Sequence, residues 1–279
     1  MSLSGFFTIT RPANSFVAGI AGIVAYLIAT GTIVPGALLI FLIVLLVTAA
    51  GNVINDYFDA EIDAINRPAR PIPSGAVSRL GAWRFAGVLF LLGILVSLVT
   101  NPLCLAITIF NALLLVAYAA RLKSTPFFGN AAVSYLAASI FLFGGALAGW
   151  NGIIHMLPIA VITFFAMLAR ELLKDAEDVK GDEAGGAVTL PIRIGIRSTA
   201  RLAFFFALLA VAASIVPYLW WGQWYLAGIL AVDCVIVAAT LVALRCGTAD
   251  CVKVSRSTTI LKLGMFVSLI VFALSAVFL

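Results

Sequence analysis

Stretches of about 20 apolar residues recur along the whole chain, and this repetition constrains the fold more than any other feature. A bilayer hydrocarbon core of roughly 30 Å needs about 20 apolar residues per helix. Because lipid cannot hydrogen-bond an exposed backbone, these stretches predict an all-α membrane protein with about nine transmembrane helices. The predicted spans are 14–30, 35–56, 82–100, 102–120, 129–150, 154–174, 200–219, 224–244 and 259–278.

Composition agrees with a membrane location. Of 279 residues, 63% are hydrophobic and only 10% are charged, whereas a soluble domain carries roughly 25% charged residues. This deficit excludes an ordinary cytosolic fold. The first 12 residues lack a basic start and a cleavage site, so we expect no signal peptide. The sequence predicts neither a zinc site nor a disulfide framework, because no CxxC or His/Cys set is formed by His155, Cys104, Cys234, Cys246 and Cys251.

The cations lie on one side of the predicted membrane. All 17 Lys and Arg residues fall in or beside the connections that share a side with the N-terminus, and the intervening connections carry none. Cytoplasmic loops are enriched in Lys and Arg, so we predict a multi-pass cell-membrane protein with a cytoplasmic N-terminus. On the opposite side we predict an interfacial aromatic belt made of Trp150, Trp220, Trp221 and Trp224.

Two acidic clusters share one spacing of four, three and four residues. The first stripe is Asn52, Asp56, Asp59 and Asp63, and the second stripe is Glu171, Asp175, Asp178 and Asp182. On a helix this spacing places side chains along one face. We therefore predict a carboxylate stripe at the cytoplasmic end of each span. The offset of 119 residues between positions 52 and 171 also predicts one domain, 1–279, with two pseudo-repeated halves of about four helices each and a last helix.

A stack of carboxylates repels itself in a low dielectric unless hard cations bridge it. Mg²⁺ prefers carboxylate oxygens together with water and substrate phosphates. Two facing stripes with two Mg²⁺ would clamp a diphosphate and neutralise its charge as it departs. The alternative is that each stripe is a solvated helix end, but matching stripes after two spans argue against it. The predicted metal-binding and catalytic residues are Asp56, Asp59, Asp63, Asp175, Asp178 and Asp182.

Several neighbouring residues fall outside the stripes. Prolines stiffen the loop after the first stripe and fix where Arg67 and Arg70 point, so both suit phosphate oxygens; the alternative is that they set topology and contact lipid headgroups. We predict the loop 185–197 to cover the second stripe. Asp233 has no assigned partner and is not expected to be catalytic, and His155 is expected to be structural. We expect three off-stripe carboxylates to be solvated, namely Glu61, Glu177 and Glu183.

At these residues the sequence resembles the UbiA superfamily of intramembrane prenyltransferases. Residues 55–63 are similar to its first Asp-rich motif and residues 175–182 to its second. Residues 118–123 resemble its Tyr-xxx-Lys element, with one extra residue before Lys123, so Arg121 is a rival for that role. Arg11 to Asn14 is similar to its opening segment. The resemblance implies nine helices around a central cavity, a cap made by the motif loops and a side opening to lipid.

Within the superfamily, residues 55–75 and 174–191 resemble the members that make the second ether bond of archaeal membrane lipids. That resemblance implies Mg²⁺-dependent transfer of geranylgeranyl from its diphosphate to the hydroxyl of geranylgeranylglyceryl phosphate. Two alternatives stay open. One is a related enzyme with an aromatic, quinone-precursor or tetrapyrrole acceptor. The other is a secondary transporter, although transporters place their acids near the bilayer centre, and both stripes here lie at one boundary.

The partners expected are a prenyl diphosphate and a lipid acceptor, without nucleic acid. No general base and no oligomeric state is predicted. The predicted substrate-binding residues are Asn14, Asn52, Asn55, Arg67, Arg70, Tyr118, Arg121, Lys123, Glu171 and Lys174.

Overall fold

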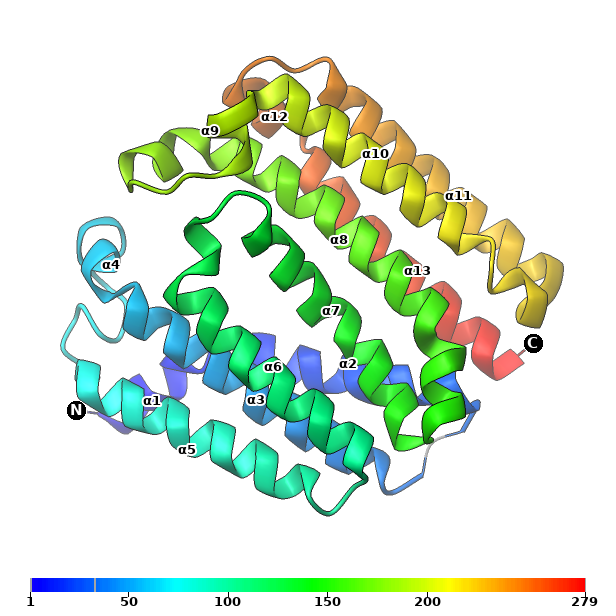
Figure 1. The fold of residues 1–279 in the computed structure, drawn as a ribbon, viewed down its shortest axis with the longest axis horizontal. Helices are drawn as coiled ribbons and strands as arrows, with labels where there is room; N and C mark the ends of the chain where they lie inside the picture. The colour runs from blue at the N-terminus through cyan, green and yellow to red at the C-terminus, as the bar shows by residue number, and fades with distance from the viewer. Residues whose placement is uncertain (1, 33, 279) are drawn as a thin grey trace.

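The protein is a bundle of helices (Figure 1), seen in a computed structural model that describes residues 2–32 and 34–278. Within these residues, nine helices are long and apolar enough to cross a membrane. The predicted all-α membrane fold is thereby confirmed, with boundaries within a few residues for most spans. The helices are α2 (Pro12–Thr30), α3 (Ala37–Phe58), α5 (Arg79–Ser97), α6 (Pro102–Ala120), α7 (Phe128–Leu147), α8 (Trp150–Ala184), α10 (Ile196–Ser214), α11 (Tyr218–Leu244) and α13 (Ser257–Phe278).

Short helices occupy the alternate connections of the bundle. They are α1 (Leu3–Ile9), α4 (Ala60–Asn66), α9 (Leu190–Ile194) and α12 (Ala249–Ser255), with a 3₁₀ turn, η1 (Leu122–Ser124). Figure 1 shows α4, α9 and α12 at one end of the bundle, opposite the tight turn between α5 and α6 and the turn between α10 and α11. We call the end with the short helices the polar end, because the connections there carry the cations.

Capping residues in the sequence set several helix starts. The Asn101 side chain accepts hydrogen bonds from the amides of Leu103 and Cys104 at the start of α6. The Ser78 hydroxyl accepts one from Gly81 N at the start of α5. Such side chains satisfy amides that have no partner inside the helix. The predicted break at Asn101-Pro102 is therefore a capped helix start, with Pro102 at its first position.

Helix α8 lies at the centre of the packing. Its buried side chains form one cluster with residues of α2, α7, α10, α11 and α13. It is also longer than the sequence predicts, since it continues from residue 174 to Ala184. The added turns keep the whole second stripe on one helix and carry it to the polar end.

The tight α7–α8 connection depends on glycine. Gly149 precedes α8 with φ of 87°, a left-handed conformation that glycine adopts without a steric penalty. A Cβ added at Gly145 would lie 2.5 Å from the Gly152 carbonyl oxygen, and one added at Gly152 would lie closer still to the Gly145 carbonyl oxygen. The two backbones are in direct contact, so this hairpin fixes the position of α8 beside α7.

The turn before α11 differs from the prediction. We expected a break at residues 220–223, but α10 ends at Ser214 and α11 begins at Tyr218, after Pro217. Gly222, with φ of 65°, is an irregularity inside α11. As a result Trp221 points inward, is only 8% exposed and packs against Tyr225 and Phe272. The predicted aromatic belt is wrong for Trp221, while the exposed tryptophans of this region are Trp150, Trp220 and Trp224.

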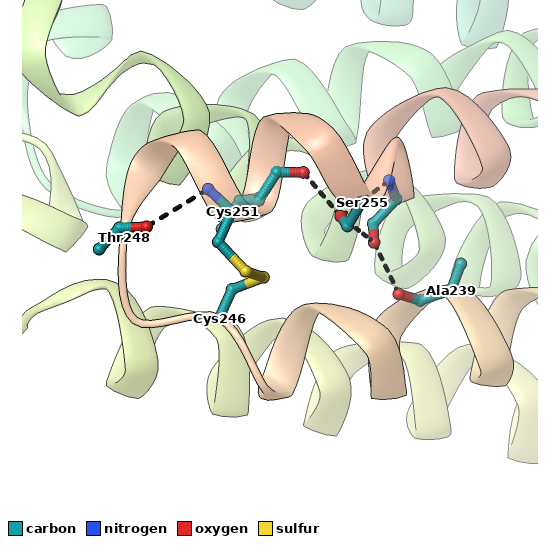
Figure 2. Close-up of a disulfide and its surroundings, with 7 residues drawn as sticks. Ala239, Cys246, Thr248, Cys251 and Ser255 are labelled. Carbon is teal, nitrogen blue, oxygen red and sulfur yellow. Dashed lines mark hydrogen bonds between the residues drawn. A yellow bond between two sulfur atoms is a disulfide. The ribbon is translucent and has the colours of Figure 1, made fainter.

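A disulfide joins Cys246 and Cys251 across the connection between α11 and α12 (Figure 2). The Thr248 hydroxyl accepts a hydrogen bond from Cys251 N and caps α12 between the two cysteines. The prediction of no disulfide is wrong for this pair, because a capped turn brings together residues five apart that match no common cysteine motif. Cys104 and Cys234 are free.

The glycine contact predicts a stability difference between two matched variants. Gly145→Ala should lower the free energy of unfolding by about 1–3 kcal/mol, because a methyl group there overlaps the α8 backbone. Gly87→Ala in α5 should be neutral or raise it by up to about 1 kcal/mol, since a Cβ at that position meets nothing within 4 Å. Thermal unfolding of both proteins in detergent checks this. Equal unfolding temperatures would contradict the described contact.

Candidate active site

A cavity of about 1120 Å³ lies between α2, α3, α6, α7 and α8 and reaches the connections at the polar end. At the polar end its lining is charged, and farther in it is formed by apolar residues such as Ile43, Val47 and Phe143. From Asn55 to Ile43, α3 covers roughly 18 Å at about 1.5 Å per residue. The cavity thus joins a charged mouth to a deep apolar compartment, and the predicted central cavity is confirmed.

The first stripe crosses a helix junction. Helix α3 ends at Phe58 and α4 begins at Ala60, with Asp59 between them. Asp59 N donates to Asn55 O at 2.9 Å, and Asp63 N donates to Asp59 O at 2.8 Å. These bonds keep helical spacing through the junction, so Asn55, Asp59 and Asp63 all line the cavity.

Each aspartate of the first stripe contacts a cation. Asp56 accepts from Arg11 at 2.6 Å and from Arg70 at 3.4 Å. Arg70 also pairs with Asp63, and Lys123 pairs with Asp59. The Asp56 side chain is only 5% exposed, and a carboxylate buried to that degree persists in its charged form only with partners of this kind.

The second stripe is arranged differently. Asn130 of α7 donates from Nδ2 to Asp175 Oδ2 at 2.8 Å, while Asp178 and Asp182 line the cavity one and two turns farther toward the polar end. The ion pairs among the described residues include none of these three aspartates. These three aspartates therefore present carboxylate oxygens that have no cation bound to them.

Tyr118 connects the two stripes. It lies near the end of α6, lines the cavity and interacts electrostatically with Asp59 of the first stripe. It interacts in the same way with Asp175 and Asp182 of the second stripe. Tyr118 therefore lies within electrostatic range of both stripes. Because residues of both stripes line the same cavity as Tyr118, the stripes face a shared space.

Most of the predicted site residues meet in this cavity. Asp56 and Arg121 are not in its lining: Asp56 lies behind it against two arginines, and Arg121 is exposed elsewhere. Of the two rival cations in the 118–123 segment, only Lys123 reaches the cavity. The predicted residues in the lining are Asn14, Asn52, Asn55, Asp59, Asp63, Arg67, Arg70, Tyr118, Lys123, Glu171, Lys174, Asp175, Asp178 and Asp182.

Three charged or amide side chains that line the cavity were not predicted. Arg11, at the start of α2, lines it and binds Asp56; its signal was its place in the opening segment. Asn130 is a buried polar residue in an apolar span. Asn111 is a half-buried polar residue in another span and donates to Ser139 Oγ at 2.8 Å. A polar residue inside a membrane span is a functional candidate by default, and that signal was present in the sequence.

Residues outside the cavity are held in other ways. Ser214 Oγ donates to Asp233 at 2.6 Å, and the Tyr225 hydroxyl donates to Ser214 O. The Thr258 hydroxyl donates to Glu177 at 2.7 Å, so Glu177 is half-buried and bound to a protein partner, whereas we expected it to be solvated. Glu61 and Glu183 are exposed. His155 packs against Trp220. Four residues of the 185–197 loop border the cavity beside the second stripe: Gly185, Gly186, Ala187 and Thr189.

The donor chemistry of the cavity mouth fits Mg²⁺. Carboxylate oxygens are the ligands this ion prefers, and it leaves positions for water and phosphate. Among the described residues, no three acidic, His or Cys side chains already form a closed metal cluster. The lining holds six carboxylates and five cations, which leaves a formal charge of −1. A diphosphate therefore enters this space favourably only together with added cations.

Comparison with known families and proteins identifies similar sequences. A model described as the UbiA prenyltransferase family matches residues 16–270. The digeranylgeranylglyceryl phosphate synthase of Methanoregula boonei is 69% identical over 279 residues, covering 100% of each chain. The protein of the same name from Methanoculleus marisnigri is 56% identical over 278 residues, covering 99% of this chain and 100% of its own.

Solved structures share the fold. One, described as giving structural and mechanistic insights into digeranylgeranylglyceryl phosphate synthase in membranes, has a TM-score of 0.89 at 36% identity and covers 99% of each chain. A UbiA homologue from Archaeoglobus fulgidus bound to GPP and Mg²⁺ has a TM-score of 0.67 at 16% identity, covering 95% of this chain and 99% of that one. At 16% identity the likeness concerns the fold alone.

The ion pairs of Arg70 predict a stability effect that is independent of activity. Arg70→Ala should lower the free energy of unfolding by about 3 kcal/mol, because buried Asp56 and Asp63 lose a shared partner. Lys180→Ala should cost less than about 1 kcal/mol, because Lys180 and its partner Asp250 are both largely exposed. Thermal unfolding of the two purified variants measures the difference. A cost for Arg70→Ala as small as that for Lys180→Ala would contradict the described network.

Proposed function

We propose that this chain, which belongs to the UbiA prenyltransferase family, transfers a geranylgeranyl group from geranylgeranyl diphosphate to geranylgeranylglyceryl phosphate. The reaction forms the second ether bond of an archaeal lipid. The chain is a multi-pass membrane prenyltransferase; the proposal concerns its two substrates. The observation that carries it is the placement of two carboxylate stripes at the mouth of an apolar cavity.

The acceptor is supported by the relatives. Two proteins named digeranylgeranylglyceryl phosphate synthase match the chain over its full length at 69% and 56% identity. A UbiA homologue of the same fold was solved with GPP and Mg²⁺, which supports a prenyl diphosphate donor and a divalent metal. The cavity agrees with both, because its apolar part suits an isoprenoid chain and its charged part suits a diphosphate.

We assign the donor diphosphate to the cavity mouth. Asp175, Asp178 and Asp182 would hold Mg²⁺ together with Asp59 and Asp63. Mg²⁺ bound there supplies charge neutralisation and Lewis-acid activation of the leaving group. Asp56, which we also predicted as a ligand, would contribute once its arginines turn to the substrate.

The cations that pair with the first stripe would also bind the substrate. Arg70 and Lys123 contact aspartates in the described structure and lie in the cavity lining beside Arg67. When the donor binds, their N–H groups would donate to diphosphate oxygens, where Arg offers a fork of donors and Lys a point charge. They stabilise the negative charge that develops on the diphosphate as the C1–O bond breaks.

The apolar compartment protects the reacting carbon. An allylic cation at C1 would form next to the charged mouth, with the isoprenoid chain extending past Val47 and Ile140 toward Phe143. The lining there is mostly aliphatic and aromatic, and its polar side chains include Thr108, Asn111 and Ser139. This part is therefore poorer in water than the mouth, which disfavours hydrolysis of the cation. The acceptor hydroxyl then has less competition from water.

The orientation and organisation of the molecule belong to the same proposal. We place the polar end at the cytoplasmic face of the cell membrane, because the cations gather there. We also infer that the chain is one domain of two pseudo-repeated halves of about four helices each plus a last helix, with the two stripes in equivalent positions. The matching spacing of positions 52–63 and 171–182 supports this repeat.

A transfer assay with purified protein tests the proposal. With Mg²⁺, labelled geranylgeranyl diphosphate and geranylgeranylglyceryl phosphate, the wild type should form a labelled diether lipid, and a chelator should stop the reaction. Asp178→Ala should lower the rate at least about 100-fold, because it removes a carboxylate from the metal site. Glu183→Gln, an exposed carboxylate of the same helix outside the cavity lining, should keep full activity.

The acceptor is tested in the same assay by replacing it with a quinone precursor, another aromatic acceptor or a tetrapyrrole. Transfer to one of these, with none to the glyceryl phosphate, would overturn the proposed acceptor. Full activity of Asp178→Ala would overturn the proposed role of the second stripe.

A further inference from the structure

We infer that Glu171 is the catalytic base, the group that takes the proton from the acceptor hydroxyl as the ether bond forms. This inference rests on the proposed function. It concerns the one carboxylate of the second stripe that lies on the apolar side of the proposed metal site.

The position of Glu171 along α8 carries the argument. It lies four residues before Asp175, which is about 6 Å deeper along the helix axis at about 1.5 Å per residue. The next cavity-lining residue inward on α8 is Met167, which is apolar. Among the α8 residues that line the cavity, Glu171 is therefore the last charged one before the apolar compartment, and it is only 8% exposed.

This boundary is where the reaction must occur. If the diphosphate lies among the stripes and the isoprenoid chain lies in the apolar compartment, their shared C1–O bond lies between the two. The acceptor oxygen must approach C1 at the same level. A carboxylate that lines the cavity there lies within reach of the hydroxyl proton, which is the first requirement for a general base.

Other carboxylates at the mouth are already committed. Asp59 and Asp63 pair with Lys123 and Arg70 in the described structure, and they are proposed metal ligands once those cations turn to the diphosphate. Asp175, Asp178 and Asp182 are the other proposed metal ligands, whose lone pairs would be occupied. Glu171 pairs only with Arg170 among the described ion pairs, and Arg170 is not in the cavity lining. The pair thus leaves the carboxylate facing the cavity.

Arg170 holds that carboxylate in place. Its Nη1 contacts Glu171, while its Nε is buried without a hydrogen-bond partner in the described structure. The side chain as a whole is 19% exposed, but a buried donor without a partner is costly, and a role in orienting Glu171 explains why Nε lies there. Arg170 is accordingly a positioning residue, with Tyr118 lying across the cavity within electrostatic range of the same carboxylate.

The step balances as follows. The C1–O bond of the donor breaks, and its electron pair leaves with the diphosphate. A lone pair of the acceptor hydroxyl forms the new C1–O bond, and the hydroxyl proton passes to the Glu171 carboxylate. After the lipid product leaves, the proton is released to solvent at the polar end, which restores the carboxylate.

Glu171→Gln tests the assignment while it keeps the size of the side chain. We expect ether formation to slow about 100-fold or more, with the KM for geranylgeranyl diphosphate changed less than threefold. Glu183→Gln is the matched control and should show neither change. If the wild type does not use the glyceryl phosphate, the proposed function is wrong. The role of Glu171 would then be tested by comparing the variant with the wild type on the acceptor hydroxyl that the enzyme does use.

A thiol acceptor separates proton removal from a structural role. An analogue whose reacting hydroxyl is replaced by a thiol is far more acidic at that group than the alcohol, since thiols such as that of cysteine have a pKa of about 8.5. At pH 9 part of the analogue is therefore already thiolate and depends much less on a base. The deficit of Glu171→Gln should shrink at least tenfold with this analogue, while the deficit of Asp178→Ala should not. An equal deficit for Glu171→Gln with both nucleophiles, or a KM that rises with the loss of rate, would overturn the inference.

Discussion

Carboxylates at the edge of a hydrocarbon layer are poorly hydrated and repel one another, so they persist there only against cations or hydrogen-bond donors. The polar end of this protein is organised around that requirement. Asp56, Asp59 and Asp63 are matched by Arg11, Arg70 and Lys123. In the second stripe, Asp175 receives a hydrogen bond from Asn130 and Glu171 pairs with Arg170, while Asp175, Asp178 and Asp182 form no ion pair among the described residues. The aspartates of the first stripe are therefore paired with Arg and Lys side chains, whereas the aspartates of the second stripe are available to bind added cations.

The helix packing serves to bring these groups together from distant parts of the chain. Helix α8 carries the second stripe beyond the predicted span, and close glycine contacts with α7 fix its position. The contact with α7 also places Asn130 against Asp175. At the far side of the cavity, the junction between α3 and α4 keeps the first stripe in helical register. The site thus depends on backbone contacts well inside the bundle.

Sequence periodicity predicted the spans well, because apolar stretches of about 20 residues have few other stable forms in a membrane. Spacing also placed every stripe residue except Asp56 on the cavity, since residues three and four apart share a helix face. The spacing could not predict which side chains pair with the aspartates, because those partners come from distant parts of the chain. Arg11 binds Asp56 across 45 residues of sequence, and the bond between Asn130 and Asp175 joins two spans. The inward position of Trp221 and the Cys246–Cys251 disulfide were also not predicted. Both depend on local turn geometry, which apolar periodicity does not indicate.

The central claim is that both stripes bind the same metal–diphosphate unit. Anomalous diffraction from crystals grown with Mn²⁺ and an unreactive thio analogue of geranylgeranyl diphosphate tests it most directly. We predict metal peaks within about 2.2 Å of carboxylate oxygens from both stripes, with the diphosphate between them and the chain in the apolar compartment. Metal bound to one stripe alone, or a diphosphate held outside this cavity, would contradict the account.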